Sequence, residues 1–324
     1  MSKTINWGII GLGKIAHKFA ADVLLVENAN LYAVASRSQD KADDFGAKYG
    51  AEKCYPTYEA LVNDPNVDAV YIATPMTFHC ENTLMSLEAG KHVLCEKAFG
   101  MNKAEVEKMI AKAQEKQLFL MEALWSRFIP GILKVMELLE NNAIGDIKTI
   151  KADFGFKAPY NVEGRLFNAD LGGGALLDIG IYPIFLSLLT LGKPTSMQTS
   201  AIMSATKVDE SNTMIFHYEN DQTAILDSTL VASTPTEAWI HGTKGSIKIP
   251  RKFHHPEQVI HYDLDFNVIA DYKLPYQGFG YCHEIEEVNN CLREGKIESD
   301  KMTFSFSLDL IELLDKVQSS FVIA

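Results

Sequence analysis

Six residues near the start of the chain have the types and the spacing of a turn that binds a dinucleotide. The string from Gly11 to Ala16, G-L-G-K-I-A, fits the pattern G-x-G-x-x-G/A and stands between an apolar run and an amphipathic stretch. Gly11 permits a tight turn, Gly13 lets the backbone approach a pyrophosphate, and Ala16 allows a helix to pack closely on a sheet. The N–H groups at the start of that helix, at Lys14 and Ile15, attract the phosphate charge. The string alone is also typical of a glycine-rich turn without a ligand, but its place between a strand and a helix favours a dinucleotide.

The residue type at the end of the second strand indicates which dinucleotide this would be. NAD enzymes usually carry an Asp or Glu roughly 20 residues after the motif, where it accepts a hydrogen bond from the ribose 2′-hydroxyl. Here Ser36 and then Arg37 occupy that place. A hydroxyl and a guanidinium suit a 2′-phosphate instead, with Lys41 as a helper. We therefore expect NADP, with NAD as the alternative. It also remains open that Arg37 is a solvated loop residue that binds no ligand.

Length and composition bound the kind of protein. The chain has 324 residues, of which 47% are hydrophobic and 22% charged, which is typical of a globular protein with two cores. Its net charge of -12 and its lack of basic runs argue against a nucleic acid or an anionic membrane as partner. Five scattered cysteines suggest neither a disulfide framework nor a zinc site, so we expect a cytoplasmic protein.

The first part of the chain alternates short apolar runs with helical patterns, as the βα units of a parallel sheet require. This predicts a Rossmann domain, a doubly wound parallel sheet, over residues 1-122. The expected strands are Asn6 to Gly11, Leu31 to Ser36, Ala69 to Ile72, His92 to Cys95 and Phe119 to Glu122. The expected helices lie at about 14–25, 39–49, 58–63, 78–89 and 102–117, with Asn102 as the N-cap of the last.

The character of the sequence changes after Ala123. One helix, at about 128–140, precedes β-rich runs that extend from Ile147 to Leu274. A helical interruption at about 174–191 contains Asp178 and Pro183, so we expect a buried helix rather than a membrane span. Two terminal helices follow, at about 278–293 and 304–320. Residues 123-324 are therefore expected to form an α+β domain on a large, mostly antiparallel sheet.

Further segments at strand ends carry a family resemblance. The strings A-T-P-M-T-F-H at 73–79 and C-E-K-A at 95–98 each follow a strand, where ligands of open α/β sheets bind. With G-L-G-K-I-A and with G-G-G-A-L-L-D-I-G-I-Y at 172–182, they resemble the Gfo/Idh/MocA family of NAD(P)-dependent sugar and polyol oxidoreductases over nearly the whole chain. The strings at 121–128, 152–156 and 241–245 are similar to the branch with the dimeric dihydrodiol dehydrogenases and the NADP-dependent D-xylose dehydrogenases. The chain departs from the pattern at Ala98, where most of the family has proline.

The resemblance implies a catalytic pair. The family's lysine matches Lys97, and its proton-transfer group on the later helix matches Tyr182. A free tyrosine has a pKa of about 10, and an adjacent ammonium favours its phenolate form, so Lys97 would tune Tyr182. Asp178 precedes Tyr182 by four residues and would share its helical face, unless Pro183 kinks the helix. From the residues alone, Tyr182 could equally be a packed tyrosine with a satisfied hydroxyl.

Other residues are expected to line the site. Besides Lys97, the expected cofactor contacts after the strands are Thr74, Pro75, His79 and Glu96. The expected substrate contacts, besides Asp178, are Trp125, Arg127, Phe154 and Phe279, with Phe156 and Arg165 as further candidates. His79 could also be an ordinary buried histidine, Glu96 an ion-pair partner or a strand-end cap, and the aromatic residues ordinary core. No set of residues has the spacing of a metal site, so we expect none.

These inferences lead to one expected function and two alternatives. We expect an enzyme that transfers a hydride between NADP(H) and a hydroxyl or carbonyl group of a sugar, polyol or vicinal diol. A non-catalytic dinucleotide sensor or regulator is the first alternative, because a fold does not settle a function. A structural partner subunit is the second. The resemblance also implies a homodimer that forms through the open face of the C-terminal sheet.

Overall fold

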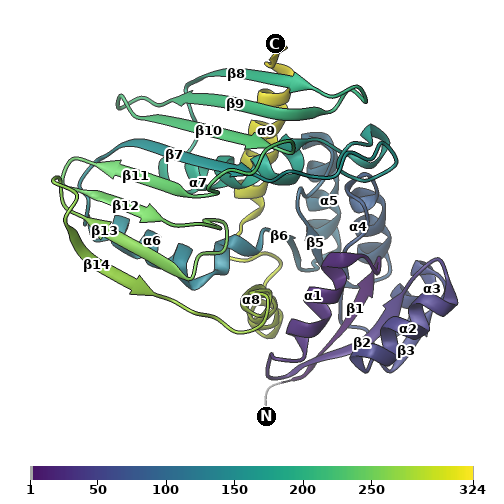
Figure 1. Cartoon of the computed structure of the whole chain (residues 1–324). Coiled ribbons are helices and arrows are strands. Elements are labelled where there is room, and N and C mark those ends of the chain that lie inside the picture. The colour runs from purple at the N-terminus through teal and green to yellow at the C-terminus, as the bar shows by residue number, and fades with distance from the viewer. Residues whose placement is uncertain (1–2, 324) are drawn as a thin grey trace. The chain divides into compact units, whose positions relative to one another are not determined.

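The chain forms two compact units in a computed structural model that describes residues 3–323 (Figure 1). The first unit consists of the residues up to Trp125 together with Gln277–Ile311, and the second of Ser126–Tyr276 together with the residues from Glu312 onward. The expected division after residue 122 differs from this in two respects, since the first unit continues to Trp125 and also contains 277–311. Residues 1, 2 and 324 of the expected domain ranges lie outside the described residues.

The first unit is built on a parallel six-stranded sheet with the order β3-β2-β1-β4-β5-β6. This is the strand order of a Rossmann fold, so the expected fold is confirmed. The strands are β1 (Ile5–Ile10), β2 (Ala29–Ala35), β3 (Lys53–Tyr55), β4 (Ala69–Ile72), β5 (His92–Glu96) and β6 (Leu120–Ala123). The sequence did not predict β3, because this edge strand has only three residues and none of them is fully buried.

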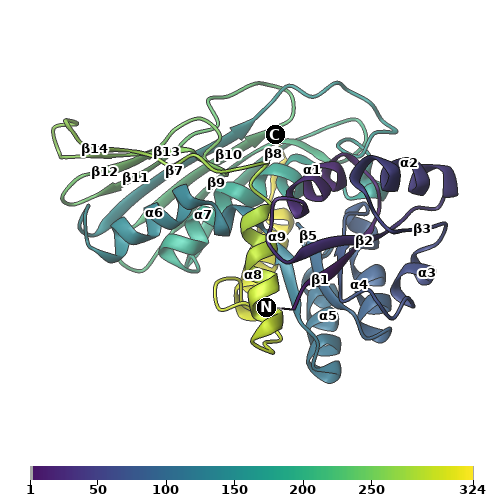
Figure 2. The ribbon, with the colours of Figure 1, turned by 90° about the horizontal axis from the view of Figure 1, so that it is seen from below.

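Helices cover both faces of this sheet (Figure 2). Helices α1 and α2 lie on one face, and α3, α4 and α5 on the other. Their bounds are α1 (Lys14–Val23), α2 (Gln39–Tyr49), α3 (Tyr58–Val62), α4 (His79–Glu88) and α5 (Lys103–Lys116). Helix α5 begins where predicted, because the Asn102 side chain accepts a hydrogen bond from the N–H of Glu105, and it buries Val106, Met109 and Ile110.

A buried aspartate attaches the segment 277–311 to the first unit. Asp22, fully buried in α1, accepts backbone N–H groups from Phe279 at 2.9 Å, Tyr281 at 2.7 Å and Cys282 at 3.3 Å. These groups lie at the start of α8 (Cys282–Arg293), where helical N–H groups have no partner within the helix. Asp22 therefore caps a helix remote from it in sequence.

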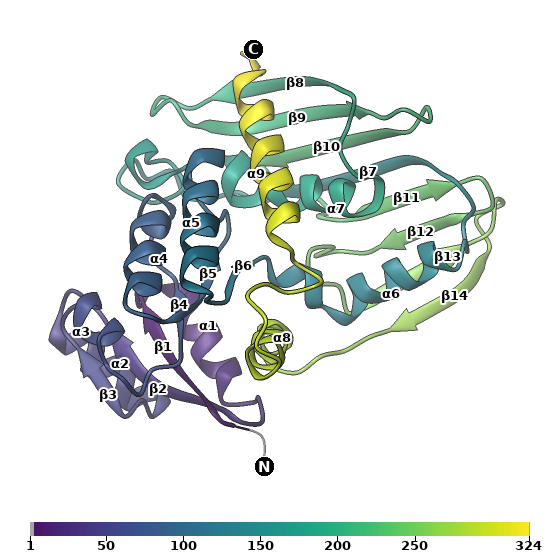
Figure 3. The same ribbon diagram turned by 180° about the vertical axis from the view of Figure 1, so that it is seen from behind.

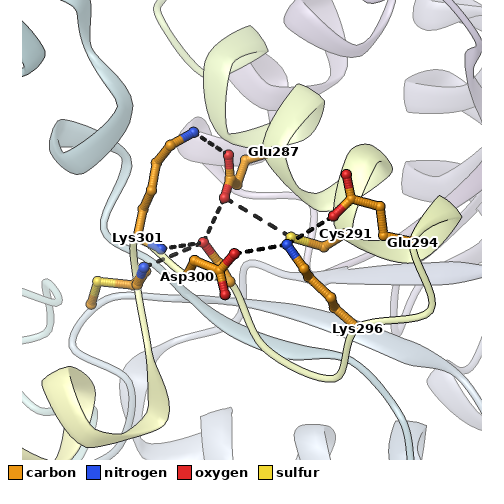
Figure 4. Close-up of polar contacts among 8 residues, drawn as sticks. Glu287, Cys291, Glu294, Lys296, Asp300 and Lys301 are labelled. Carbon is orange, nitrogen blue, oxygen red and sulfur yellow. Dashed lines mark hydrogen bonds and ion pairs between the residues drawn. The ribbon is translucent and has the colours of Figure 1, made fainter.

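Ion pairs fasten the turn that follows α8 (Figure 4). Lys296 lies between Glu294 at 2.8 Å and Asp300 at 2.7 Å, and Lys301 pairs with Glu287 at 2.5 Å. The lysines are substantially exposed, and exposed pairs contribute about 1 kcal/mol or less each. The buried apolar side of α8, rather than these pairs, must supply most of its attachment.

The second unit is built on a nine-stranded sheet with the order β14-β13-β12-β11-β7-β10-β9-β8-β15. Neighbours pair antiparallel except β7 with β10 and β8 with β15. The expected large, mostly antiparallel sheet is confirmed. The strands are β7 (Ile147–Gly155), β8 (Ser196–Met203), β9 (Asp209–His217), β10 (Thr223–Thr229), β11 (Ala238–Gly242), β12 (Ser246–Ile249), β13 (Gln258–Tyr262), β14 (Val268–Lys273) and β15 (Val322–Ile323).

Helices α6 (Pro130–Glu140) and α7 (Ile181–Leu191) lie on one face of this sheet (Figures 2 and 3). A last helix, α9 (Phe304–Ser319), contains the boundary between the two units. The stretch Ala169–Leu191 is the one helical segment of the described residues that is long and apolar enough to cross a membrane, and 83% of its most apolar window is buried in the fold. The predicted buried helix at 174–191 is therefore confirmed.

Candidate active site

The glycine turn after β1 has the geometry that the sequence predicts. Gly11 has a φ of +85°, and a Cβ there would lie 2.8 Å from the carbonyl carbon of Ala73 and from the nitrogen of Thr74. Only glycine fits such an approach. A Cβ on Gly13, by contrast, would meet no atom within 4 Å, so the surface beside this residue is open to a ligand. Ala16, a residue of α1, is fully buried.

The start of α1 suits an anion. The helix begins at Lys14, followed by Ile15, and its first turn contains no acidic residue. Its first N–H groups have no partner within the helix and attract negative charge. The turn and the helix start therefore fit a pyrophosphate.

The end of β2 suits a 2′-phosphate. Ser36 follows the strand, donates its N–H to the carbonyl of Tyr55 at 3.1 Å and accepts the N–H of Ser38 on its hydroxyl at 3.3 Å. Arg37 and Lys41 are exposed. Burial raises the pKa of Tyr58, and the positive charge of Arg37 partly offsets that rise. Arg37 thus lies beside Tyr58 at the edge where the expected dinucleotide would place its ribose.

His79 ties together the loops that follow β4 and β5. Its side chain is buried, with Nδ1 2.9 Å from the carbonyl oxygen of Ala98 and Nε2 3.0 Å from that of Thr74. The Thr74 hydroxyl accepts the Asn82 side-chain N–H at 3.1 Å, and Pro75 precedes the short helical turn Met76–Phe78 that leads into α4. His79 therefore holds the backbone of both loops, which is the structural role that the sequence left open beside a cofactor contact.

Lys97 stands one residue past the end of β5 and is partly exposed. Its N–H donates to the Glu96 carboxylate at 3.2 Å, and the other oxygen of Glu96 accepts the hydroxyl of Tyr71. The Lys97–Ala98 peptide bond is cis. Glu96 thus fixes the backbone of Lys97 from the buried side, while the lysine itself lies at the carboxyl edge of the sheet, where ligands of this fold bind.

In the second unit, Asp178 and Tyr182 lie on consecutive helical segments. Asp178 belongs to a π-helical turn, Leu176–Gly180, and Tyr182 to the first turn of α7. Pro183 has no N–H to donate, and the wider π turn ends three residues before it. Arg165 donates to the Asp178 carboxylate at 2.8 Å. Arg165 is therefore a partner of Asp178, a role that its spacing in the sequence did not reveal.

A buried carboxylate on β9 holds the start of this helical segment. Asp209 accepts the N–H of Leu176 at 2.8 Å and the side-chain N–H of Asn212 at 2.8 Å. A Cβ on Gly174, whose φ is +123°, would lie 2.3 Å from Asp209. Burial raises the pKa of Asp209 to about 6, although these hydrogen bonds favour its ionised form. Asp209 therefore positions the helix that carries Tyr182.

Tyr182 lies in an aromatic cluster. The tyrosine ring is 5.6 Å from that of Phe154 and 4.9 Å from that of His254, and the Phe154 and His254 rings stack at 4.4 Å. Phe156 packs with Phe154 against a neighbouring apolar cluster. His254 was not predicted from the sequence as a site residue, because this histidine lies in the loop between β12 and β13.

The remaining predicted residues fall in different units. Trp125 is buried and stacks on Tyr281 at 4.8 Å within the first unit, which is the packing role left open for it. Phe279, also in the first unit, is 49% exposed, and the Lys18 ammonium lies 5.8 Å from the centre of its ring. Arg127 is partly exposed in the second unit. Of the predicted substrate contacts, the structure brings Phe154 together with Tyr182.

No group of three or more His, Cys, Asp or Glu side chains within residues 3–323 is arranged to hold a metal ion. All five cysteines are free.

Comparison with known proteins identifies the family. Residues 5–124 match the model described as the oxidoreductase family with an NAD-binding Rossmann fold, and residues 132–248 match the GFO/IDH/MocA C-terminal domain. The trans-1,2-dihydrobenzene-1,2-diol dehydrogenase of Danio rerio is 37% identical, over 97% of this chain and 96% of its own length. The chain belongs to the GFO/IDH/MocA oxidoreductase family. The resemblance in the sequence is thereby confirmed.

A further relative and a solved structure that resembles this chain carry NADP in their names. The D-xylose 1-dehydrogenase (NADP(+)) of Hypocrea jecorina is 33% identical, over 97% of this chain and 91% of its own. The solved structure of KijD10, a 3-ketoreductase from Actinomadura kijaniata in complex with NADP and TDP-benzene, superposes with a TM-score of 0.88 at 27% identity, over 99% of both chains. The protein is thus an oxidoreductase of a family whose N-terminal domain binds a nicotinamide dinucleotide.

Proposed function

We propose that this protein transfers a hydride between NADP(H) and a hydroxyl or carbonyl group of a sugar, polyol or vicinal diol. The observation that carries the proposal is the placement of Lys97, at the carboxyl edge of the sheet whose first turn fits a pyrophosphate. Two relatives that match this chain over nearly its full length are named as a diol dehydrogenase and a xylose dehydrogenase, and these names support the substrate class. Ser36 and Arg37 at the end of β2 support NADP over NAD.

The chain's own residues would bind the substrate oxygen and move its proton, while the nicotinamide supplies or accepts the hydride. Tyr182 is the proposed proton-transfer group. A tyrosine with a pKa of about 10 is a poor base at neutral pH, and the ammonium of Lys97 would favour its phenolate form and orient the substrate oxygen. Asp178, fixed by Arg165, would accept a hydrogen bond from a substrate hydroxyl.

Aromatic residues would form the rest of the substrate site. Phe154 and His254 flank Tyr182 and offer flat apolar surfaces with one titratable ring. We propose Trp125, Arg127 and Phe279 as further substrate contacts. The cofactor contacts proposed beyond the glycine turn are Thr74, Pro75, His79, Glu96 and Lys97.

Reduced-nicotinamide absorbance in the presence of diols, pentoses, hexoses and dicarbonyls tests the proposal. Lys97→Met and Tyr182→Phe should each lower kcat by about a hundredfold to ten-thousandfold, the usual contribution of a proton-transfer group. Tyr160→Phe is the matched control, because Tyr160 is 55% exposed and should leave kcat unchanged. Turnover that survives both site changes would refute the assignment.

The same measurements separate the alternatives. A dinucleotide sensor would bind NADPH in calorimetry and turn over no substrate in the panel, and a structural subunit would not bind NADPH at all.

We further propose that residues 123-324 supply substrate binding and dimerisation, and that the protein is a cytoplasmic homodimer. The sheet of the second unit carries a row of aromatic rings, in which Trp239 lies 5.4 Å from His241, 5.5 Å from Tyr262 and 6.0 Å from Phe266. Phe266 is 55% exposed, and exposed apolar patches commonly mark interfaces. A monomeric mass in sedimentation would dismiss the dimer.

A further inference from the structure

Glu122 has a buried carboxyl group near Lys97, the proposed active-site lysine. The proposed function gives this carboxyl group no role. Glu122 lies in β6, opposite Cys95 of β5 in the sheet register, and is 2% exposed. One of its oxygens, Oε1, accepts the backbone N–H of Phe99 at 3.1 Å. Phe99 is two residues after Lys97, so this side chain holds the loop that carries the lysine.

The carboxyl of Glu122 also interacts with the charge of Lys97. The pKa of Glu122 is raised to about 7, mainly by burial and also by the negative charge of Glu96. The hydroxyl of Ser307, the N–H of Phe99 and the charge of Lys97 act in the opposite direction. An interaction between two titrating groups is mutual, because a proton gained or lost at one changes the free energy of ionising the other.

The two glutamates near Lys97 differ in what they hold. Glu96 accepts the N–H of Lys97 and the hydroxyl of Tyr71, so its carboxylate is occupied on both oxygens. Glu122 holds the loop two residues after the lysine, where it accepts the N–H of Phe99. The titratable groups that interact with Glu122 are Lys97 and Glu96 on β5 and its loop, and Cys95 across the sheet.

We propose that Glu122 is a positioning residue for Lys97, which fixes the backbone from Lys97 to Phe99 and, when ionised, holds the lysine in its ammonium form. The part that Lys97 plays in hydride transfer rests on the proposed function, whereas the coupling between the two side chains does not. The ammonium is the form of Lys97 that would orient a substrate oxygen and favour a phenolate.

Competitive trace acetylation of the full-length protein tests this coupling, with the peptide that contains Lys97 quantified by mass spectrometry. The labelling rate of a lysine follows its free amine, so a titration from about pH 6 to about pH 11 gives its midpoint. Glu122→Gln keeps an oxygen for the Phe99 N–H and removes the charge. The Lys97 midpoint should fall by about one pH unit in this variant, and it should stay near the wild-type value in Glu122→Asp.

Glu105→Gln is the matched control. Glu105 also holds this loop, since its Oε2 accepts the N–H of Met101 at 2.9 Å, but it lies on α5 at the far end of the loop. The Lys97 midpoint should not move in Glu105→Gln. An unchanged midpoint in folded Glu122→Gln, or an equal shift in the control, would overturn the proposal.

A reciprocal variant serves if Glu122→Gln does not fold. In Lys97→Met the Glu122 carboxyl loses its cationic neighbour, so its protonated C=O band in difference infrared spectra should persist to higher pH than in the wild type. A band that titrates at the same pH would also overturn the proposal. If the coupling is present and Lys97→Met retains turnover, the proposed function fails while this inference stands. If Lys97→Met abolishes turnover and the coupling is absent, the reverse holds.

Discussion

The carboxyl edge of the Rossmann sheet and the start of α7 both carry proposed site residues, but the chain positions them in different ways. At the sheet edge, Gly11, Ser36 and Lys97 each stand directly after a strand, so the strand itself positions them. At the start of α7, Asp178 depends on a hydrogen bond from Arg165, and Leu176 on one to Asp209. The strand ends place the first three residues, and side chains such as Glu122 then hold the loop after Lys97. The second arrangement depends on side chains from other elements from the start.

The largest expected effect comes from the glycine turn, where backbone geometry alone should determine dinucleotide binding. Gly11→Val would place side-chain atoms against the Ala73–Thr74 backbone at a φ of +85°, so both stability and NADPH affinity should fall. A Cβ on Gly13 meets no atom within 4 Å, so Gly13→Val should fold normally. It should still block the pyrophosphate and weaken NADPH binding about a hundredfold, as the loss of about 3 kcal/mol implies.

Calorimetric titration with NADPH and thermal melting measure both effects. Full NADPH affinity in a folded Gly13→Val protein would show that the turn does not bind the dinucleotide. The sheet edge would then not be a cofactor site positioned by local sequence.

The predictability of the two regions follows the same division. The strand ends, the glycine turn and the doubly wound parallel sheet were predicted, because period and motif are properties of consecutive residues. The cap that Asp22 supplies to α8 was not, since its partners lie 257 to 260 positions away. His254 and Asp209 were also missed, because a single histidine or aspartate gives no sign in the sequence of what it will contact in the fold.

The segment 277–311 shows what such a contact does to a domain boundary. Its helix was predicted at about 278–293 and is found at Cys282–Arg293, but which unit it joins depends on Asp22. Local pattern therefore predicts where an element lies in the chain, and buried polar contacts determine where it packs.

A change at Arg37 is expected to have a smaller effect on NADPH affinity. It tests nucleotide selection at the sheet edge. If the Arg37 guanidinium binds a 2′-phosphate, Arg37→Ala should weaken NADPH binding about 10- to 100-fold, because a charge-assisted bidentate contact is worth about 1.5–3 kcal/mol. The affinity for NADH, which has no such phosphate, should not change. Lys41→Ala, on the first turn of α2, is the graded control and should cost less.

Fluorescence titrations of both nucleotides measure the difference. Equal losses for NADPH and NADH in Arg37→Ala would mean that the arginine supports the fold of the edge and does not select the nucleotide.

Asp209 is expected to give the smallest effect, a change of stability with pH. It tests the start of α7, the region that depends on side chains from other elements. The pKa of Asp209 is raised by burial from 3.8 to about 6 in the folded protein, so its protonated form is favoured by folding. The associated stability is present in full below pH 3.8 and is lost as the pH rises through 6. Between about pH 5 and about pH 7 the wild type should lose about 1 kcal/mol from this group alone.

Asp209→Asn removes that titration, so the variant should be less stable than the wild type at pH 5, and the gap in melting temperature should narrow by pH 7. Asp227→Asn is the matched control: Asp227 is on the neighbouring strand β10, bonded to Thr213 at an exposed position. The change in the Asp209→Asn gap with pH is compared with the change measured for Asp227→Asn. A constant gap for Asp209→Asn would mean that the carboxylate stays ionised throughout this range, and that burial does not raise its pKa to about 6.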